Sequence, residues 1–202
     1  MERKYAWHNY DDATMEKVYA LSDTYRQFLD NGKTERECVV QAVEFAEAKG
    51  YVNLNDIIKS NTSIKAGDKI YYTHMDKSIA LFNIGTDDIE LGMNILGAHI
   101  DSPRIDVKQN PQYEDSNLVF WDTHYYGGIK KYHWVAMPLA IHGVVVKTDG
   151  TRININIGDK ETDPIFCITD LLPHLGQEQM QKNAAKVIEG ESLDLLIGSQ
   201  PV

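Results

Sequence analysis

The first part of the chain carries a helical pattern of apolar positions. Between residues 12 and 30, apolar side chains recur every three or four positions, and Asn31-Gly32 supplies a stop signal. Thr34 and Glu37 then have the spacing of a capping box, in which two side chains satisfy free backbone N–H groups at a helix start. A narrow stripe of small apolar residues follows, up to Gly50. The pattern predicts two consecutive helices, the second packed closely against a sheet.

After a polar loop at residues 59–68, the pattern changes to short apolar runs. Residues 69–72, 78–84 and 93–98 are such runs, and turn residues separate them. The second and third runs are apolar at nearly every position, which is typical of strands buried on both faces. These runs predict a sheet, so the first half of the chain is expected to be an α/β unit.

Helical signals become sparse after residue 108. The segment VVVKTDGTRININIG predicts a hairpin, because isoleucines alternate with polar residues and Asp149-Gly150 suits a type I′ turn. A short helix is expected over residues 176–188, with Met180, Ala184, Val187 and Ile188 facing inward, and SLDLLIG predicts a last strand. We therefore expect an α/β part followed by a mostly β part, with the change near residue 107. The two predicted helices are thin cover for a sheet buried on both faces, which suggests that a further segment completes the α/β part.

Composition and charge narrow the class of protein. The 202 residues are 43% hydrophobic and 25% charged, and the formal net charge is −10. A nucleic-acid surface needs a basic patch, so this balance argues against a nucleic-acid partner. The most apolar stretch, WVAMPLAIHGVVV, is interrupted by Pro138 and is too short to span a bilayer, so no membrane association is expected. Cys38 and Cys167 lie far apart without CxxC spacing, which predicts two reduced thiols in a cytoplasmic protein.

Two histidines stand two positions before an aspartate. Residues i and i+2 of an extended segment point to the same side, so the carboxylate can orient an imidazole that binds a metal through its other nitrogen. His99, with Asp101, follows an apolar run and opens a loop, the position at which α/β sheets place their sites. His74, with Asp76, lies in a polar connection that reads as a solvent-exposed loop. His99 is the candidate metal ligand, and a structural histidine is the alternative.

One other histidine has a distinctive setting. His174 follows Pro173 in a stiffened loop before the short predicted helix, where it could face a partner or a substrate, with a surface or capping role as the alternative. The chain has no GxSxG, HExxH, P-loop or GxGxxG motif, so none of these common motifs points to a different chemistry.

Several segments, in order, resemble the aspartyl aminopeptidase / aminopeptidase I family of zinc metallo-aminopeptidases, in the form seen in bacterial members. GAHIDSPRIDVK is similar to the family's His-Thr-Asp-Ser-Pro segment, and KSIALFNIG to the strand that precedes it. YYGGIKKYHWVAMPLAIHGVVVKTDG resembles the family's Tyr-Gly-Gly-Gly stretch and the β segment after it. LLPHLGQEQ, followed by LDLLIGSQP, is similar to the same branch. The resemblance runs from about residue 15 and rests on motif order as well as on single motifs.

The resemblance implies an α/β fold in two parts. Residues 1–107 would be an incomplete zinc-peptidase-like catalytic domain, and residues 108–202 a β-rich assembly domain. His99 would bind one zinc ion of a two-metal site, at which cobalt or manganese could also bind, and Asp101 would orient His99 or adjoin the site as a catalytic residue. His174 would lie near a loop that reaches the substrate site of a neighbouring subunit. The implied partners are peptide substrates and further copies of the chain.

Family members are much longer than this chain. The resemblance therefore implies an N-terminal portion of a metal-dependent aminopeptidase that hydrolyses N-terminal residues from peptides, with most metal ligands and the general base outside it. A lone histidine with one carboxylate is a poor zinc site, so the isolated chain is expected to be inactive. The alternative is a non-catalytic truncated subunit that assembles with full-length copies.

Overall fold

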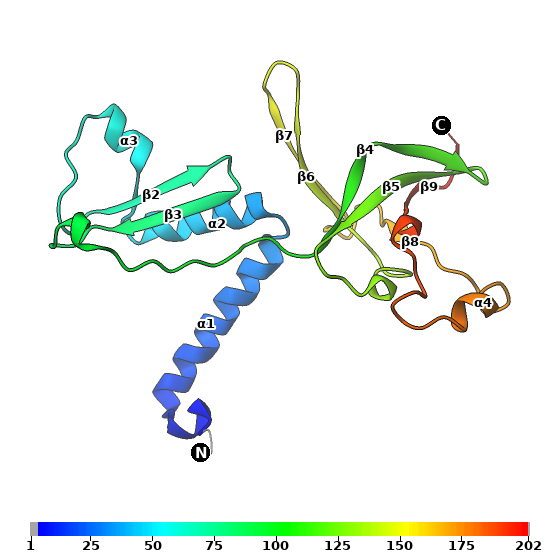
Figure 1. The fold of residues 1–202 in the computed structure, drawn as a ribbon, viewed down its shortest axis with the longest axis horizontal. Helices are drawn as coiled ribbons and strands as arrows, with labels where there is room; N and C mark the ends of the chain where they lie inside the picture. The colour runs from blue at the N-terminus through cyan, green and yellow to red at the C-terminus, as the bar shows by residue number, and fades with distance from the viewer. Residues whose placement is uncertain (1–3, 202) are drawn as a thin grey trace. The chain divides into compact units, whose positions relative to one another are not determined.

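The computed structural model describes residues 4–201, and the chain divides into two compact units, Met1–Asp101 and Ser102–Val202. Figure 1 labels the elements of both units. The first unit combines helices with a small sheet, and the second consists mainly of strands. The predicted mixture of helices and strands is therefore confirmed.

Both predicted helices of the first unit are confirmed. A short 3-10 helix, η1 (Ala6–Asn9), precedes α1 (Asp12–Asn31), and the Asp11 carboxylate caps α1 by accepting a hydrogen bond from the Thr14 N–H at 2.8 Å. The second helix, α2 (Glu35–Ala48), begins with both hydrogen bonds of the predicted capping box. Its buried residues are Cys38, Val39 and Ala46, so its small apolar stripe faces the interior of the unit.

The sheet of the first unit has three strands in the order β1-β2-β3. β1 (Val52–Asn53) pairs parallel to β2 (Lys69–His74), and β3 (Ser78–Asn83) pairs antiparallel to β2. Between β1 and β2 lies α3 (Leu54–Lys59), a short helix that the sequence pattern did not predict. The second helix packs against β2 and β3, and the Tyr71 hydroxyl of the central strand donates a hydrogen bond to Glu47 of this helix at 2.7 Å. Ile70 and Tyr71 are both buried.

Two expectations about buried strands are wrong. In β3, the side chains of Leu81 and Phe82 are 50% and 45% exposed, and residues 93–98 form no strand. After η2 (Ile89–Leu91), the chain from 92 to 103 has no regular structure, and Leu96 is fully exposed. An apolar run becomes a buried strand only where a neighbouring strand and a covering layer meet it. Within the described part of this unit, α2 and the short α3 pack against the sheet, and no strand pairs with residues 93–98.

The second unit is built on an antiparallel sheet with the strand order β4-β5-β9-β8. The strands are β4 (Arg104–Asp115), β5 (Leu118–Tyr126), β8 (Cys167–Ile168) and β9 (Leu195–Gly198). Ser116 and Asn117 join the first two strands with positive φ at both positions, as a tight primed turn requires. The pairing of β4 with β5 shifts in register between Val107 and Gln112, next to Pro111, which cannot donate a ladder hydrogen bond.

One hydrophobic cluster holds the second unit together. Its buried members are Phe166, Ile168, Ile188, Leu193 and Leu195. Thr123 lies beside this cluster, and its buried hydroxyl donates a hydrogen bond to the Leu193 carbonyl. The cluster therefore joins the strand β5 to the loop that precedes β9.

The predicted hairpin is confirmed, but its turn differs from the expectation. β6 (Ile141–Val146) pairs with β7 (Arg152–Ile157), and only Gly150 of the loop has positive φ. A type I′ turn needs positive φ at both central residues, so the Asp149-Gly150 prediction is wrong. The Gly150 N–H donates to the Lys147 carbonyl at 2.9 Å, and the Asp149 carboxylate accepts from the Thr151 N–H at 2.8 Å. The longer loop is of the kind in which glycine closes a type I turn.

The predicted helix over residues 176–188 is also wrong in length. Only α4 (Gln177–Met180) is helical, and the chain then turns through the following residues. Met180 and Ala184 are exposed, whereas Ile188 is buried in the hydrophobic cluster. Ile188 and the partly buried Val187 pack against the cluster at the end of this segment. Inward residues at one end alone are too little to hold several turns of amphipathic helix.

Two further 3-10 turns, η3 (Lys131–His133) and η4 (Gly190–Ser192), complete the second unit. Across residues 4–201, no helix has the length and apolar character that crossing a membrane would require.

Candidate functional site

His99 and Asp101 lie close together in the irregular segment after η2. The His99 Nδ1 atom is 3.0 Å from the Asp101 carbonyl oxygen and 3.3 Å from the Asp101 carboxylate. Both neighbours are acceptors, so the favoured neutral tautomer carries its proton on Nδ1 and leaves the Nε2 lone pair available. The His99 side chain is 84% exposed, which leaves the ring accessible to an incoming ligand. An acceptor beside Nδ1, whether carbonyl or carboxylate, is able to orient an imidazole so that its other nitrogen can bind a metal ion.

The backbone of this segment explains why the two side chains meet. Gly92 opens it at φ 114°, a value that side chains with a Cβ rarely adopt. Pro103 closes it and disfavours helical backbone at the residue before it. The chain between them is non-helical, so positions 99 and 101 can present their side chains together.

These residues meet only part of what a zinc ion requires. Even catalytic zinc sites use three protein ligands. Within residues 4–201, no group of three or more histidine, cysteine, aspartate or glutamate side chains is arranged to hold a metal ion. His99 and Asp101 offer one imidazole and one carboxylate, and the described residues do not form a complete zinc site.

The other His-x-Asp pair has different surroundings. His74 is the last residue of β2, and Met75 and Asp76 both have positive φ in the turn that follows. The Arg36 guanidinium donates a hydrogen bond to the Met75 carbonyl at 2.8 Å and lies 4.0 Å from the Asp76 carboxylate. Arg36 therefore holds this turn against α2, which gives the Asp76 carboxylate a structural role.

His174 lies in a tight turn of the second unit. The Leu172 carbonyl accepts hydrogen bonds from the N–H groups of Leu175 and Gly176, each at 2.9 Å, and this closes the turn around Pro173 and His174. The His174 side chain is exposed. The neighbouring leucines are exposed as well, at 55%, 67% and 72% for Leu171, Leu172 and Leu175. The turn thus presents a histidine among apolar side chains.

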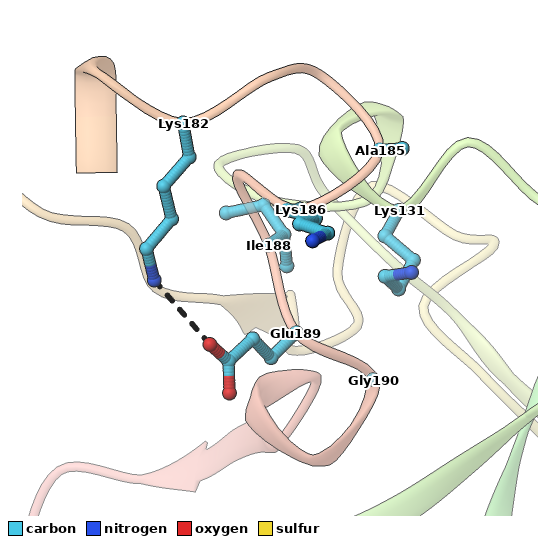
Figure 2. A pocket seen from close by; sticks show the side chains of 7 residues that line it. All are labelled: Lys131, Lys182, Ala185, Lys186, Ile188, Glu189 and Gly190. Carbon is cyan, nitrogen blue, oxygen red and sulfur yellow. Dashed lines mark hydrogen bonds and ion pairs between the residues drawn. The ribbon is translucent and has the colours of Figure 1, made fainter.

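A lysine-lined pocket in the second unit was missed by the sequence reasoning. It has a volume of about 430 Å³, and Figure 2 shows the residues that line it. Lys131 of η3 and Lys182 and Lys186 from the loop after α4 all border it. In the sequence, Lys131 stands out only because Lys130 is next to it. In the loop after α4, the sequence pattern that could have pointed to the pocket is the spacing of four residues between Lys182 and Lys186.

Two polar groups join β4 to the region around η4 and β9. The Lys108 ammonium group lies 2.9 Å from the Asp122 carboxylate and 3.0 Å from that of Glu191, and these bonds raise the Lys108 pKa. The Tyr113 hydroxyl donates a hydrogen bond to Asp194 at 2.6 Å. Burial raises the pKa of Tyr113 well above its ordinary value, and the Asp194 carboxylate raises it further. Both contacts tie the edge strand to the rest of the sheet.

Comparisons with known proteins agree with one another. The family model described as aminopeptidase I zinc metalloprotease (M18) matches residues 28–200. A protein of Clostridium acetobutylicum named probable M18 family aminopeptidase 1 is 52% identical over 201 residues, which cover 100% of this chain and 43% of that protein.

Solved structures give the same result. The crystal structure of an aminopeptidase (M18 family) from Thermotoga maritima superposes with a TM-score of 0.89 at 43% identity, covering 100% of this chain and 43% of that one. The crystal structure of aminopeptidase I from Clostridium acetobutylicum has a TM-score of 0.83 at 52% identity, with 98% and 43% covered. The chain thus spans less than half the length of these relatives.

Proposed function

Because the chain belongs to the aminopeptidase I (M18) family of zinc metalloproteases, we propose that it forms part of an enzyme that hydrolyses N-terminal residues from peptides. The observation that carries this proposal is the pairing of His99 with Asp101, because it prepares one imidazole for a metal ion. The relatives are more than twice as long as the chain, so a complete site would need groups from outside residues 4–201.

In the proposed enzyme, His99 and Asp101 have separate roles. The exposed imidazole would be one zinc ligand through Nε2, and the Asp101 oxygens would hold its proton at Nδ1. Asp101 thereby acts as a positioning residue, because it acts through the ring of His99. A bound zinc ion would supply Lewis-acid chemistry to peptide hydrolysis, and the family resemblance implies two such ions, with cobalt and manganese as alternatives.

We assign the catalytic part to the first unit and an assembly role to the second. The first unit carries His99 and Asp101, and the second presents the exposed leucines around His174. Exposed apolar clusters on soluble proteins mark interaction sites. The proposed occupant is another copy of the protein, and His174 would then face that neighbouring subunit. The two cysteines are free, which supports a location in the reducing cytoplasm.

A second candidate function rests on the exposed leucines of the second unit. A non-catalytic subunit that assembles with longer copies needs such an apolar surface and no complete metal site of its own. The two candidates differ in one measurable respect. If the chain contributes to the active site, changing His99 abolishes activity. If it is only an assembly subunit, changing His99 has no effect and only changes to its surface matter.

A chimera tests the proposed function. In the Clostridium acetobutylicum relative, the matching 201 residues are exchanged for this chain, which is 52% identical to them. We expect the chimera to hydrolyse aminoacyl-p-nitroanilides with added zinc, and His99→Ala to abolish that activity because a ligand is lost. Asp101→Asn is expected to lower zinc affinity or activity by about 10- to 100-fold, the usual cost of losing a group that orients a metal ligand.

His74→Ala is the matched control, because it removes the histidine of the other His-x-Asp pair. It is expected to leave both zinc content and activity close to those of the parent chimera. A folded chimera without activity would contradict the proposal. Activity that survives His99→Ala but not His74→Ala would move the metal ligand to the other pair. The 202-residue chain alone serves as the blank and is expected to show no turnover.

A further inference from the structure

The lysine-lined pocket lies entirely within the second unit and away from the His99 segment in sequence. Its floor is apolar, because Ile188 is 7% exposed and belongs to the hydrophobic cluster. Its rim carries Lys131, Lys182, Lys186 and Glu189. Three ammonium groups and one carboxylate leave a formal surplus of two positive charges among the lining residues. This is notable in a chain whose formal net charge is −10.

The lysines of the rim differ in their partners. Lys182 extends to Glu189, with 3.3 Å between the ammonium nitrogen and the carboxylate oxygen, so these two charges offset each other. In Figure 2, Lys186 and Lys131 lie on the other side of Ile188 from this ion pair. Among the residues that the structure describes, neither Lys131 nor Lys186 forms an ion pair with a carboxylate. The positive surplus is therefore on one side of the pocket.

The ring of Tyr125 contacts both Lys131 and the Gly190 backbone on the side of the pocket with the positive surplus. The Lys131 ammonium group is 5.7 Å from the centre of the Tyr125 ring, within the range of a cation–π contact. The backbone of Gly190 approaches the same ring so closely that a Cβ at position 190 would lie 2.7 Å from the Tyr125 Cε1 atom. Glycine thus allows the loop to close over the ring. Lys131 is half-buried beside it, which limits the freedom that its side chain would lose on binding a ligand.

We propose that this pocket binds a small dianion through Lys131 and Lys186. The two unpaired ammonium groups match two negative charges, and the apolar floor can accept a short carbon stem. Phosphate groups and dicarboxylates share this chemistry, and a pocket of about 430 Å³ is large enough for either as a small metabolite-sized molecule. The inference does not depend on the proposed peptidase activity.

Titration of the 202-residue chain followed by amide NMR tests the proposal. The two probes are inorganic phosphate and succinate, each added at constant ionic strength against chloride. Saturable shifts are expected at the amides of residues 182–190, which border the pocket, with a Kd on the order of 1 mM from two charge-assisted hydrogen bonds. Shifts with phosphate alone identify a phosphate site, and shifts with succinate alone identify a dicarboxylate site.

Charge variants distinguish anion binding in the pocket from non-specific attraction of anions to surface lysines. Replacing both Lys131 and Lys186 by glutamine is expected to weaken binding at least about tenfold. Glu189→Gln is expected to strengthen binding, because it removes a negative charge and releases Lys182. Lys147→Gln removes one positive charge from the exposed hairpin loop and is the control for the loss of a lysine charge outside the pocket. The absence of saturable shifts with both anions, or equal weakening by Lys147→Gln, would overturn the proposal.

Discussion

Tyr113 shows how a single side chain links burial to pH dependence. Its hydroxyl donates to Asp194, and the other Asp194 carboxylate oxygen is buried without a hydrogen-bond partner within the described part of the chain. Burial and this carboxylate both raise the Tyr113 pKa in the folded chain. In the unfolded chain the tyrosine has its ordinary pKa of about 10.

The sign of the effect follows from these two pKa values. At pH 8 the tyrosine is neutral in both states, so its contribution to folding is complete. As pH rises above about 10, the unfolded chain loses the proton first, and the free energy of unfolding falls. In Tyr113→Phe no hydroxyl ionises at this position, so the pH-dependent fall in the free energy of unfolding is smaller. The thermal unfolding midpoint of the variant is therefore expected to fall less steeply with pH above 10 than that of the parent.

Thermal unfolding between pH 8 and pH 11 measures this slope. Tyr19→Phe is the control, because it removes a hydroxyl from a tyrosine that is 62% exposed on α1. Equal slopes for Tyr113→Phe and the parent would mean that the Tyr113 hydroxyl is not protected in the folded chain.

At the scale of one element, the capping box of α2 has the clearest consequence. The Thr34 hydroxyl accepts from the Glu37 N–H at 3.3 Å, and the Glu37 carboxylate accepts from the Thr34 N–H at 2.9 Å. Thr34→Ala removes the first bond and leaves an N–H at the helix start without its acceptor. We expect the first unit to lose about 1 kcal/mol of stability, the usual effect of deleting a helix cap. Urea denaturation followed by circular dichroism measures this change.

Thr24→Ala is a suitable comparison for the cap variant. Thr24 lies inside α1, is exposed, and donates its hydroxyl hydrogen to the Ala20 carbonyl. Alanine has the higher helix propensity at such a position, so this change is expected to be neutral or slightly stabilising. A loss of stability as large in Thr24→Ala as in Thr34→Ala would show that the cap has no special contribution.

The β6–β7 hairpin has an apolar face that is only partly buried. Ile153, Ile155 and Ile157 lie on one face, as the sequence alternation predicts, but their burial differs along the strand. Ile157 packs against the hydrophobic cluster, whereas Ile153 is 37% exposed beside Val145, which is 50% exposed. A two-stranded hairpin is marginally stable by itself, so the exposed half of this face is a surface that association would stabilise.

At the scale of the whole molecule, we expect the chain to self-associate through its second unit. Ile155→Asp places a charge on the apolar face of the hairpin and is expected to raise the dissociation constant at least about tenfold, because a charge would be buried in the contact. The net charge of −10 makes the copies repel one another, so added salt is expected to strengthen association.

Light scattering at micromolar concentrations measures the association. Asn154→Asp introduces the same side chain at the neighbouring exposed position, on the opposite face of β7, and is expected to have a much smaller effect. Light scattering from a single chain at every concentration, in the parent and in both variants, would show that the hairpin face needs no second copy.

Much of the molecule could be predicted from the sequence because it depends on neighbours along the chain. The helices α1 and α2, the cap at Thr34 and the alternation in β7 follow from hydrogen bonds and side-chain periods that span a few residues. The proximity of His99 to Asp101 has the same origin, because two positions on a non-helical segment separate them. The order of motifs was likewise enough to identify the family.

Only the tertiary structure decided which apolar segments are buried. Residues 79–82 and 93–98 have the composition of buried strands, yet burial requires a covering layer, and composition does not say whether one is present. The short length of α4 has a related cause, since Ile188 alone of the predicted inward residues is fully buried. The lysine-lined pocket joins residues about fifty positions apart, and their shared surface exists only because the fold brings η3 beside the loop after α4. Local interactions depend on residues that are neighbours in the sequence and can be predicted from it. Contacts between distant residues depend on every surface that the fold brings together.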